Sequence, residues 1–410
     1  MKLACERSGM RALLAYCTAM CTIASCDSSL STADDYGESE RELQLEESLR
    51  IGGLDGTEEY TFGFVSTLAP ASDGSVYVAD AQIPVVRRYD AQGRFMANIG
   101  RSGEGPGEYR SLDGLAGLTN GRLAVWDARL RRATLFNAEG TYEESIPLPS
   151  GLGAWRGFVW SPGGDLFVRT RAEGPTLDGS GEVPSRWSRV TPDTDPEALH
   201  NVPAEDRDGP RYVLSGRGGY YRPFVTMTLS TIGPNGAFYY VRNDEYAIHH
   251  IHPDGTETAI HRDEPRVRLR AEEKAEWESR SEMFARRSPD RRPEFFPIPD
   301  LKPLIRELVV DLEGRLWVSR YTEAVFMEYS EAEAADARQR NVPPYQWRDS
   351  PRWDIYSADD RFIGSATFPF RTSFITAVGD MVWGIQAGEY LEDYVVRWKL
   401  DGLLSLANDR

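Results

Sequence analysis

Residues 71–100 read ASDGSVYVADAQIPVVRRYDAQGRFMANIG, and residues 118–147 read LTNGRLAVWDARLRRATLFNAEGTYEESIP. The two stretches follow one sequence pattern, which therefore occurs twice in the chain. A repeat with a period in the forties and four strands per unit is typical of a propeller blade. Four pairs of anchors share one spacing of 47 residues: Gly74 with Gly121, Asp80 with Asp127, Asp90 with Asn137, and Gly93 with Gly140.

Each copy has the chemistry of antiparallel strands joined by tight turns. Asp73-Gly74 and Asn120-Gly121 supply the positive φ that a short hairpin needs, and alternating apolar runs follow them. Asp80 and Asp127 close the second strand of each copy. Because they repeat, we interpret both as turn-capping residues, and a functional role is the alternative. Each unit leaves an apolar face uncovered, so the units must stack on one another.

Weaker copies of the pattern follow, and the last of them contains only three strands. Residues 45–52 (LEESLRIG) resemble the closing strand of the repeat (RFMANIG). We therefore predict that this N-terminal strand completes the last blade and leaves no sheet edge open. The predicted fold is all-β, a six-bladed β-propeller over residues 44–402. The weaker copies cover about 158–190, 224–261, 308–362 and 373–400.

Three departures interrupt the regular pattern. The first, at 171–222, is rich in Gly, Pro and Arg. The second, at about 263–305, includes the helix-forming run 268–287, which places Trp277 and Phe284 on one face. The third, at about 321–351, includes a predicted short helix over Glu331 to Arg340. We expect these insertions, rather than the regular blades, to hold the binding surface.

The first 26 residues have the pattern of an exported lipoprotein. Basic residues precede an apolar run that is too short to anchor stably in a bilayer. The run ends in Ile23-Ala24-Ser25-Cys26, which resembles the bacterial lipobox. The resemblance implies removal of residues 1–25 and lipidation of Cys26, with residues 26–43 as an acidic flexible tether. An ordinary signal peptide is the alternative, and the choice between inner and outer membrane stays open.

Charge and cysteine content narrow the possible partners. The net charge of −17 argues against nucleic acid and against electrostatic attraction to anionic lipid, so the acyl chains must provide the membrane binding. The body beyond Cys26 contains no cysteine, and therefore no disulfide or thiol chemistry. The four cysteines of the chain are Cys5, Cys17, Cys21 and Cys26.

The link between the two clear copies carries a family resemblance. Residues 103–109 (GEGPGEY), with DGSVYVAD before them and YDAQGRF nearby, resemble the NHL-type six-bladed β-propellers of bacterial envelope proteins. The similarity is strong over residues 50–148 and weaker beyond. No Lys-Ser/Thr follows the glycines, so we interpret the link as a turn between blades rather than a phosphate loop. The resemblance implies the fold but leaves lyases, lactonases and binding proteins as possible functions.

Catalytic chemistry has little support in the sequence. A metal in the central pore needs ligands from several blades, whereas four of the five histidines lie in or beside one blade. His250 and His252 share a face of one strand, and we interpret the cluster as a polar outer edge of blade four. The mature chain has no GxSxG elbow and no cysteine nucleophile. We predict no catalytic residue, cofactor or metal, although calcium in an acidic pore stays possible.

Arginines beside aromatic residues in the insertions are the candidate ligand-binding residues, because this composition is typical of recognition surfaces. Solvated charge on long loops is the alternative. The favoured function is a lipid-anchored cell-envelope module that binds a protein, peptide or carbohydrate. A metal-dependent propeller lyase or hydrolase with its site in the pore is the alternative, so enzymatic activity is left open. The candidates are Arg217, Tyr220, Tyr221, Arg222, Arg291 and Arg292.

Overall fold

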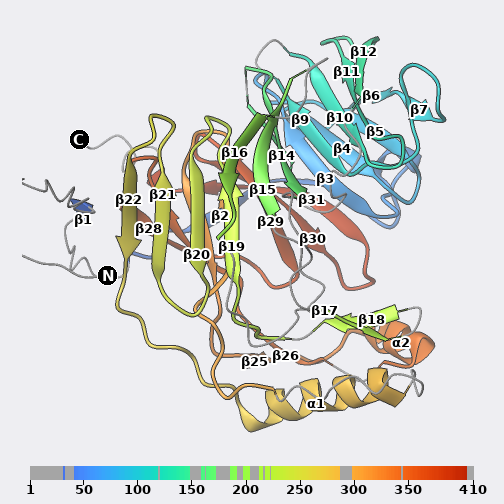
Figure 1. Cartoon of the computed structure of the whole chain (residues 1–410). Helices are drawn as coiled ribbons and strands as arrows, with labels where there is room; N and C mark the ends of the chain where they lie inside the picture. The colour runs from blue at the N-terminus through green and yellow to red at the C-terminus, as the bar shows by residue number, and fades with distance from the viewer. Residues whose placement is uncertain are drawn as a thin grey trace, which may run out of the picture. The chain divides into compact units, whose positions relative to one another are not determined.

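Among the residues that the structure describes, six sheets with four antiparallel strands each form the blades of a six-bladed β-propeller, one of them extended by a short fifth strand (Figure 1). This confirms the predicted fold class. The strands pair in chain order from the innermost to the outermost strand of each blade. The computed structural model describes residues 31–32, 41–118, 121–147, 158–161, 163–171, 185–191, 197–203, 212–215, 218–221, 223–286, 298–342 and 345–403.

The six blades are built from consecutive strands, except that the last is completed from the N-terminus. Their strands are, in order, β3 (Val65–Pro70), β4 (Val76–Asp80), β5 (Val85–Tyr89) and β6 (Phe95–Ile99); β9 (Gly114–Gly117), β10 (Leu123–Asp127), β11 (Arg132–Phe136) and β12 (Tyr142–Pro147); β13 (Phe158–Trp160), β14 (Leu166–Arg171), β15 (Ser185–Val190) and β16 (Glu197–Asn201); β19 (Thr228–Ile232), β20 (Phe238–Arg242), β21 (Ala247–Ile251) and β22 (Glu257–His261); β23 (Ile305–Val310), β24 (Leu316–Arg320), β27 (Arg352–Tyr356) and β28 (Phe362–Thr367); β29 (Thr372–Val378), β30 (Met381–Ala387), β31 (Asp393–Leu400) and β2 (Leu45–Ile51).

Apolar side chains on both faces of each blade hold the ring together. Successive side chains of a strand point to opposite faces. In β4, Val76 and Val78 pack against blade six, whereas Tyr77 and Ala79 pack against blade two. A separate buried cluster fills each of the six junctions between neighbouring blades, including the junction of blade six with blade one. The buried apolar faces therefore close into a ring.

The N-terminal strand β2 closes the ring, as the sequence predicts. It pairs antiparallel with β31, with Leu45 opposite Leu400 and Ile51 opposite Val395. Packing of the N-terminal segment begins earlier than residue 44, because Leu43 is buried and its amide donates to Ser365 O on the outer strand of blade five (2.7 Å). A two-residue strand, β1 (Ser31–Thr32), pairs parallel with β22 at the outer edge of blade four.

The short turns between strands contain glycines in the backbone conformation that the repeat predicts. Gly74 and Gly121 have φ of 81° and 77°, in the left-handed region that favours glycine. The 103–109 link is a turn between blades, as predicted, with β7 (Arg101–Ser102) and β8 (Glu108–Tyr109) pairing within it. Tyr109 is buried at the junction of blades one and two, where its hydroxyl accepts from Val86 N (3.0 Å) and donates to Ile99 O (2.5 Å).

The repeated aspartates join neighbouring backbone segments. The Asp80 carboxylate accepts from Gly63 N (2.9 Å) before blade one and from Gln82 N (3.1 Å) in its own turn. Asp127 does the same in blade two, accepting from Arg110 N (2.6 Å) and Leu130 N (2.9 Å). These bonds confirm the turn-capping prediction.

The insertions leave the propeller at one end. They follow either the second strand of a blade or the fourth, and antiparallel pairing brings both of these strands to the same end. Both predicted helices are present, and a capping box formed by Ser330 and Glu333 begins the second. The inserted elements are α1 (Ala271–Arg286), α2 (Glu331–Arg340), β25 (Val325–Phe326), β26 (Trp347–Arg348), β17 (Tyr212–Ser215) and β18 (Gly218–Tyr221), and a 3-10 turn, η1 (Glu58–Tyr60), precedes blade one.

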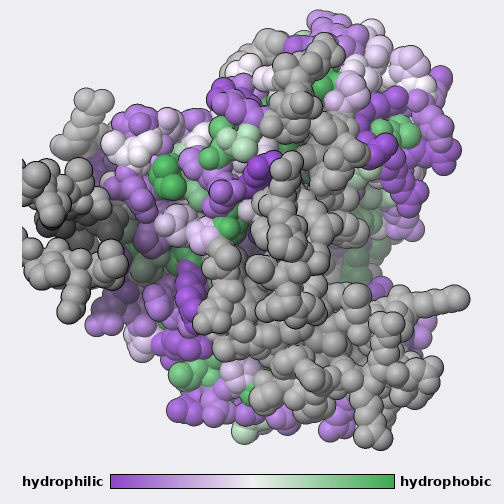
Figure 2. Space-filling model, viewed as in Figure 1, coloured by the Kyte–Doolittle hydropathy of each residue, from purple (hydrophilic) through white to green (hydrophobic). Residues whose placement is uncertain are grey.

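Hydrophilic residues cover most of the described surface in the view of Figure 2, with apolar residues in small separate groups. Such scattered apolar residues are normal on a folded protein. Within the part of the chain that the structure describes, no helix combines the length and the apolar character that crossing a bilayer requires.

Ile51 tests the closure of the ring. Its side chain is 1% exposed and packs between blades six and one. We expect Ile51→Ala to lower the free energy of unfolding by about 2–5 kcal/mol, because it removes buried methyl groups and leaves a cavity. Chemical denaturation measures the change. Met96→Ala on the exposed side of β6 is the matched control, and equal losses for the two variants would contradict the role of Ile51 in closure.

Candidate binding site in the central channel

A cavity of about 800 Å³ runs along the axis of the propeller. The innermost strand of every blade contributes to its wall: β3, β9, β13, β19, β23 and β29. This follows from the fold, because the ring leaves one face of the innermost strands without a neighbouring sheet. Thr67, Thr231 and Thr376 lie among apolar residues along this wall. The channel is thus concave and mixed in polarity, as small-molecule sites are.

The inserted segments contribute aromatic side chains to the channel. Phe224, Trp277, Tyr321 and Tyr345 all line it. The Trp277 ring on α1 lies 4.7 Å from the Tyr345 ring and 5.9 Å from the Phe224 ring, measured between centroids. Aromatic clusters of this kind supply large, rigid contact surfaces for a ligand. We call these four aromatic residues, together with α1 and the antiparallel strand pair β25–β26, the cap.

A buried charge cluster fixes α1 to the propeller. Lys302 is fully buried, and its ammonium lies 2.7 Å from Glu273 Oε1 on α1 and 2.7 Å from Asp349 Oδ1. It also donates to Thr322 O (3.0 Å). Burial raises the pKa of the Glu273 carboxyl, and Lys302 offsets part of that rise. Two carboxylates thus share one cation, and removing that cation would leave both without compensation.

Polar contacts to the second insertion position α1 further. The Glu276 carboxylate accepts from the backbone amides of Gln346 (2.9 Å) and Trp347 (3.2 Å). The guanidinium of Arg270 lies over the Trp347 ring, 5.3 Å from its centroid, and pairs with Glu323. The cap is therefore a packed layer made by the two insertions on either side of β23 and β24, which Figure 1 shows beside one end of the blades.

Two polar groups at the channel have no hydrogen-bond partner among the described residues. Arg306 on β23 is exposed within the wall and makes no hydrogen bond or ion pair to any residue that the structure describes. Its charge acts on Tyr345, partly offsetting the rise in the Tyr345 pKa that burial causes. The buried Nε1–H of Trp277 has no acceptor among the described residues. A cation and an N–H donor beside aromatic rings form a site for an anionic or carbonyl-bearing ligand.

The other charged groups of the channel already have partners. Arg169 Nε donates to Ser185 Oγ (2.9 Å). Asp113 accepts from Ser111 Oγ (2.6 Å) and Ala128 N (2.8 Å), and Asp349 binds Lys302. Glu307 on β23 also lines the wall and has an interaction of its own, so the charge without a partner on the described wall of the channel is that of Arg306.

The ligand-binding residues predicted from the sequence stay predictions. Arg217, Arg222, Arg291 and Arg292 lie outside the described residues, as does Cys26. Tyr220 and Tyr221 belong to β18, which contacts α1, but their side chains lie outside the description. Arg306, Trp277 and Tyr345 were not predicted as site residues. Arg306 is the second residue of the innermost strand β23, at the irregularity in its pairing with β24, and no pattern in the sequence pointed to it.

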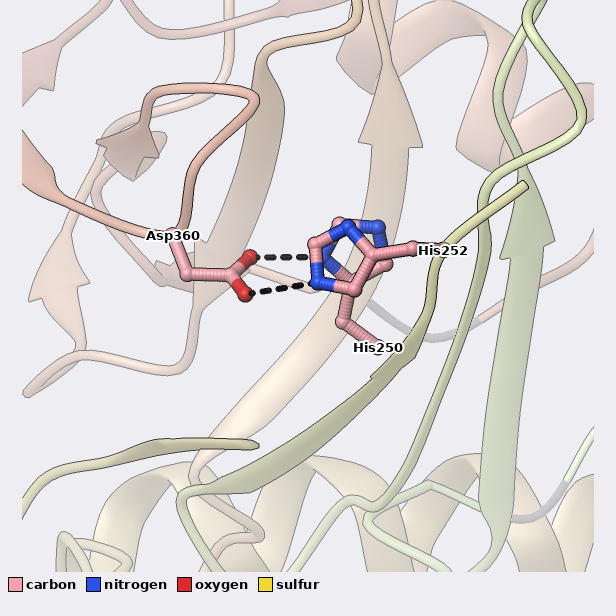
Figure 3. Close-up of side chains that lie close together, drawn as sticks. All are labelled: His250, His252 and Asp360. Atoms are coloured by element: carbon pink, nitrogen blue, oxygen red, sulfur yellow. Dashed lines mark hydrogen bonds and ion pairs between the residues drawn. The ribbon is translucent and has the colours of Figure 1, made fainter. Parts of the chain in front are cut away.

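The histidine cluster differs from its prediction as a polar outer edge. His249 is half-exposed and bonds Glu257, but His250 is 1% exposed and faces blade five. The reason is the two-residue alternation of β21, which turns His250 inward toward the next blade. His250, His252 and Asp360 lie close together (Figure 3), and they are the one group of three potential metal ligands among the described residues. They lie between blades four and five, away from the channel.

The fold and the site define a six-bladed β-propeller with a capped central channel. Residues 35–153 match the family DUF5128, described as a 6-bladed beta-propeller. No curated protein matches the sequence.

Several solved structures are similar in fold to this chain. A putative exported protein from Bacteroides fragilis is 12% identical, with a TM-score of 0.46, over 90% of this chain and 98% of that one. A member of the DUF4221 family from Bacteroides vulgatus is 9% identical, with a TM-score of 0.49, over 88% and 99%. The virginiamycin B lyase of Staphylococcus aureus is 12% identical, with a TM-score of 0.40, over 87% and 99%.

Lys302 tests the attachment of the cap. We expect Lys302→Met to increase hydrogen exchange at the α1 amides, because Glu273 and Asp349 lose their shared cation, while β4 and β10 stay protected. Lys274→Met is the control, since Lys274 pairs with Asp300 near the surface, where ion pairs contribute less than about 1 kcal/mol. Unchanged exchange of α1 in Lys302→Met would contradict this role of the cluster.

Proposed function

We propose that the protein is a lipid-anchored binding module of the bacterial cell envelope. Its ligand is a small molecule or the end of a peptide that has an apolar or aromatic part and an anionic group. Arg306 carries this proposal, because it places an unpaired cation beside the aromatic cap of the channel. The anionic group would bind the Arg306 guanidinium, and the apolar part would pack against Trp277 and Tyr345.

The dimensions and the chemistry of the channel support a ligand of this kind. Its volume of about 800 Å³ lies within the range of about 300–1,000 Å³ that is usual for ligand pockets. Hydrogen bonds to a charged group contribute about 1.5–3 kcal/mol. The buried Trp277 N–H lacks an acceptor, and a ligand oxygen would supply one and remove the penalty of leaving it unpaired.

The alternative function, a metal-dependent lyase or hydrolase, has less support. Its metal would lie in the pore, where the described carboxylates Asp113 and Asp349 already accept bonds from neighbouring groups and Glu307 also has a partner. The described histidine and carboxylate cluster lies between two blades instead. We therefore propose ligand binding, rather than metal-dependent catalysis, as the function.

The envelope location rests on the N-terminal sequence. The pattern that ends at Cys26 supports export and lipidation. The strongly acidic composition supports a body that does not bind anionic lipid by charge, so that several acyl chains on one residue would hold it at the membrane.

A pair of fluorescent probes tests the channel. Dansylglycine has an aromatic part and a carboxylate, and dansylamide lacks the carboxylate. We expect Arg306→Gln to weaken binding of dansylglycine to the full chain by about tenfold or more, since one charge-assisted bond is lost. Binding of dansylamide should stay unchanged. Fluorescence titration measures both.

Arg94→Gln is the matched control for this test, because Arg94 is a solvent-exposed arginine on blade one that pairs with Asp90. It should leave both titrations unchanged. If Arg306→Gln weakens the two probes equally, or Arg94→Gln weakens dansylglycine as much, the assignment of Arg306 to an anionic group is wrong.

Cys26 tests the membrane anchor. We expect Cys26→Ala to abolish labelling by an alkyne fatty acid and to move the protein out of the membrane fraction, because the thiol that accepts the lipid is gone. Cys21→Ala, which changes a cysteine before the predicted cleavage point, should keep both. Continued labelling of Cys26→Ala would rule out lipidation at this residue.

A further inference from the structure

The junction of blades four and five contains a group of side chains that the channel does not explain. His250 lies on β21, and His252 follows at its end. Asp360 lies in the turn between β27 and β28 of the next blade. Both turns are at the end of the propeller opposite the cap, because the insertions leave after the second and fourth strands. The three side chains thus come from two blades and meet at one point (Figure 3).

The alternation of the strands explains why these residues meet. His250 and His252 are two residues apart and face blade five, whereas His249, which directly precedes His250, faces the other way, toward Glu257. Thr258 on β22 is the cross-strand neighbour of His250. On the blade-five side, Asp360 has a φ of 64°, and its amide donates to Ser357 O (3.0 Å), so the turn presents the carboxylate to the histidines.

The distances suit a metal ion. His250 Nδ1 lies 2.8 Å from Asp360 Oδ1, and His252 Nε2 lies 3.7 Å from Asp360 Oδ2. The three potential ligand atoms all lie within 4.8 Å of one another. Tetrahedral zinc with nitrogen and oxygen ligands at its usual bond lengths holds such atoms about 3.3 Å apart. Figure 3 shows both imidazole rings directed at the one carboxylate, so small shifts would place an ion among the three.

Unpaired buried atoms supply a second observation. The His250 ring is 1% exposed, and its Nε2 has no partner among the described residues. It stacks on the Tyr239 ring with centroids 4.0 Å apart, and the buried Tyr239 hydroxyl is also without a described partner. Hydrogen bonds within the cluster engage His250 Nδ1, His252 Nε2 (2.9 Å from Thr258 Oγ1) and the Asp360 carboxylate, but they leave His250 Nε2 and the Tyr239 hydroxyl without a described partner. Orphan atoms of this kind mark places where an ion or ordered water belongs.

From this geometry we propose that His250, His252 and Asp360 bind a divalent transition-metal ion, with Zn²⁺ as the first candidate. Two imidazole nitrogens and one carboxylate oxygen are a donor set that zinc accepts. Thr258 would hold the carboxylate, because its hydroxyl donates to Asp360 Oδ2. His252 is 23% exposed at its side chain, which leaves access for the ion and a fourth position for water.

Such an ion would link the two blades. His250 and His252 belong to blade four and Asp360 to blade five, so the metal would connect strands that are otherwise joined by side-chain packing and hydrogen bonds at this point. The proposed role is structural. It is independent of the ligand in the channel, since the cluster lies at the opposite end from the cap.

Zinc binding by the full chain tests the proposal. Protein stripped with EDTA is titrated with ZnSO₄ by calorimetry, and bound zinc is counted by atomic emission after dialysis. We expect one tight site per chain and a higher thermal midpoint with zinc. His252→Ala should weaken the site by about a hundredfold and remove the zinc-dependent stabilisation, as expected for loss of a direct ligand.

His249→Ala is the matched control, because His249 directly precedes His250 on the same strand and faces away, toward Glu257. It should bind zinc like the wild type. Both variants keep the four cysteines. Any zinc bound by thiols would therefore be the same in the two variants and could not cause a difference between them. Circular dichroism checks folding, and Asp360→Asn serves as a second ligand variant. Absence of a tight site, or equal loss in His249→Ala, would overturn the proposal.

Discussion

The apolar faces of the blades impose the constraint on which the rest of this structure depends. A single four-stranded sheet such as β3–β6 buries neither of its faces by itself. Each blade must therefore pack against two neighbours, and the packing can end only when the last blade meets the first. In this protein the cluster that contains Ile51, Val76 and Trp383 makes that final junction. The N-terminal strand β2 takes part in it, so closing the ring joins the two ends of the folded chain.

The channel and its cap follow from the same constraint. The innermost strands have no further sheet on the axial side, and their side chains line an open space rather than a core. The connections between strands are long at one end of the propeller and short at the other. The cap therefore lies at one end of the channel. Burying Lys302 between Glu273 and Asp349 joins the cap to the ring through charge instead of apolar packing. This arrangement keeps Trp277 and Tyr345 at the channel while the blades retain their regular form.

The junction between blades four and five departs from apolar packing at both of its ends. Near the cap, Asp354 accepts from Tyr246 (2.8 Å) and Ser365 (2.7 Å) and pairs with Arg262 (3.2 Å), so its oxygens are fully used. Burial raises the pKa of Tyr246, which keeps that hydroxyl protonated as a donor. At the far end, His250 and Tyr239 keep unpaired atoms. The contrast between a satisfied and an unsatisfied polar cluster in one junction distinguishes a structural network from a candidate ion site.

The sequence by itself determined the repeat, the strand alternation, the turn glycines, the two helices and the closing strand, because these depend on interactions between residues that are near in the chain or related by the period. The role of Asp80 and Asp127 also followed from their repetition. Only the tertiary structure decided which side chains meet across blades. The approach of Asp360 to His250, and of Arg306 to Tyr345, depends on the register and twist of separate sheets, and no local pattern records either. The buried state of His250 was missed for that reason, since its environment is created by a blade that begins more than fifty residues later.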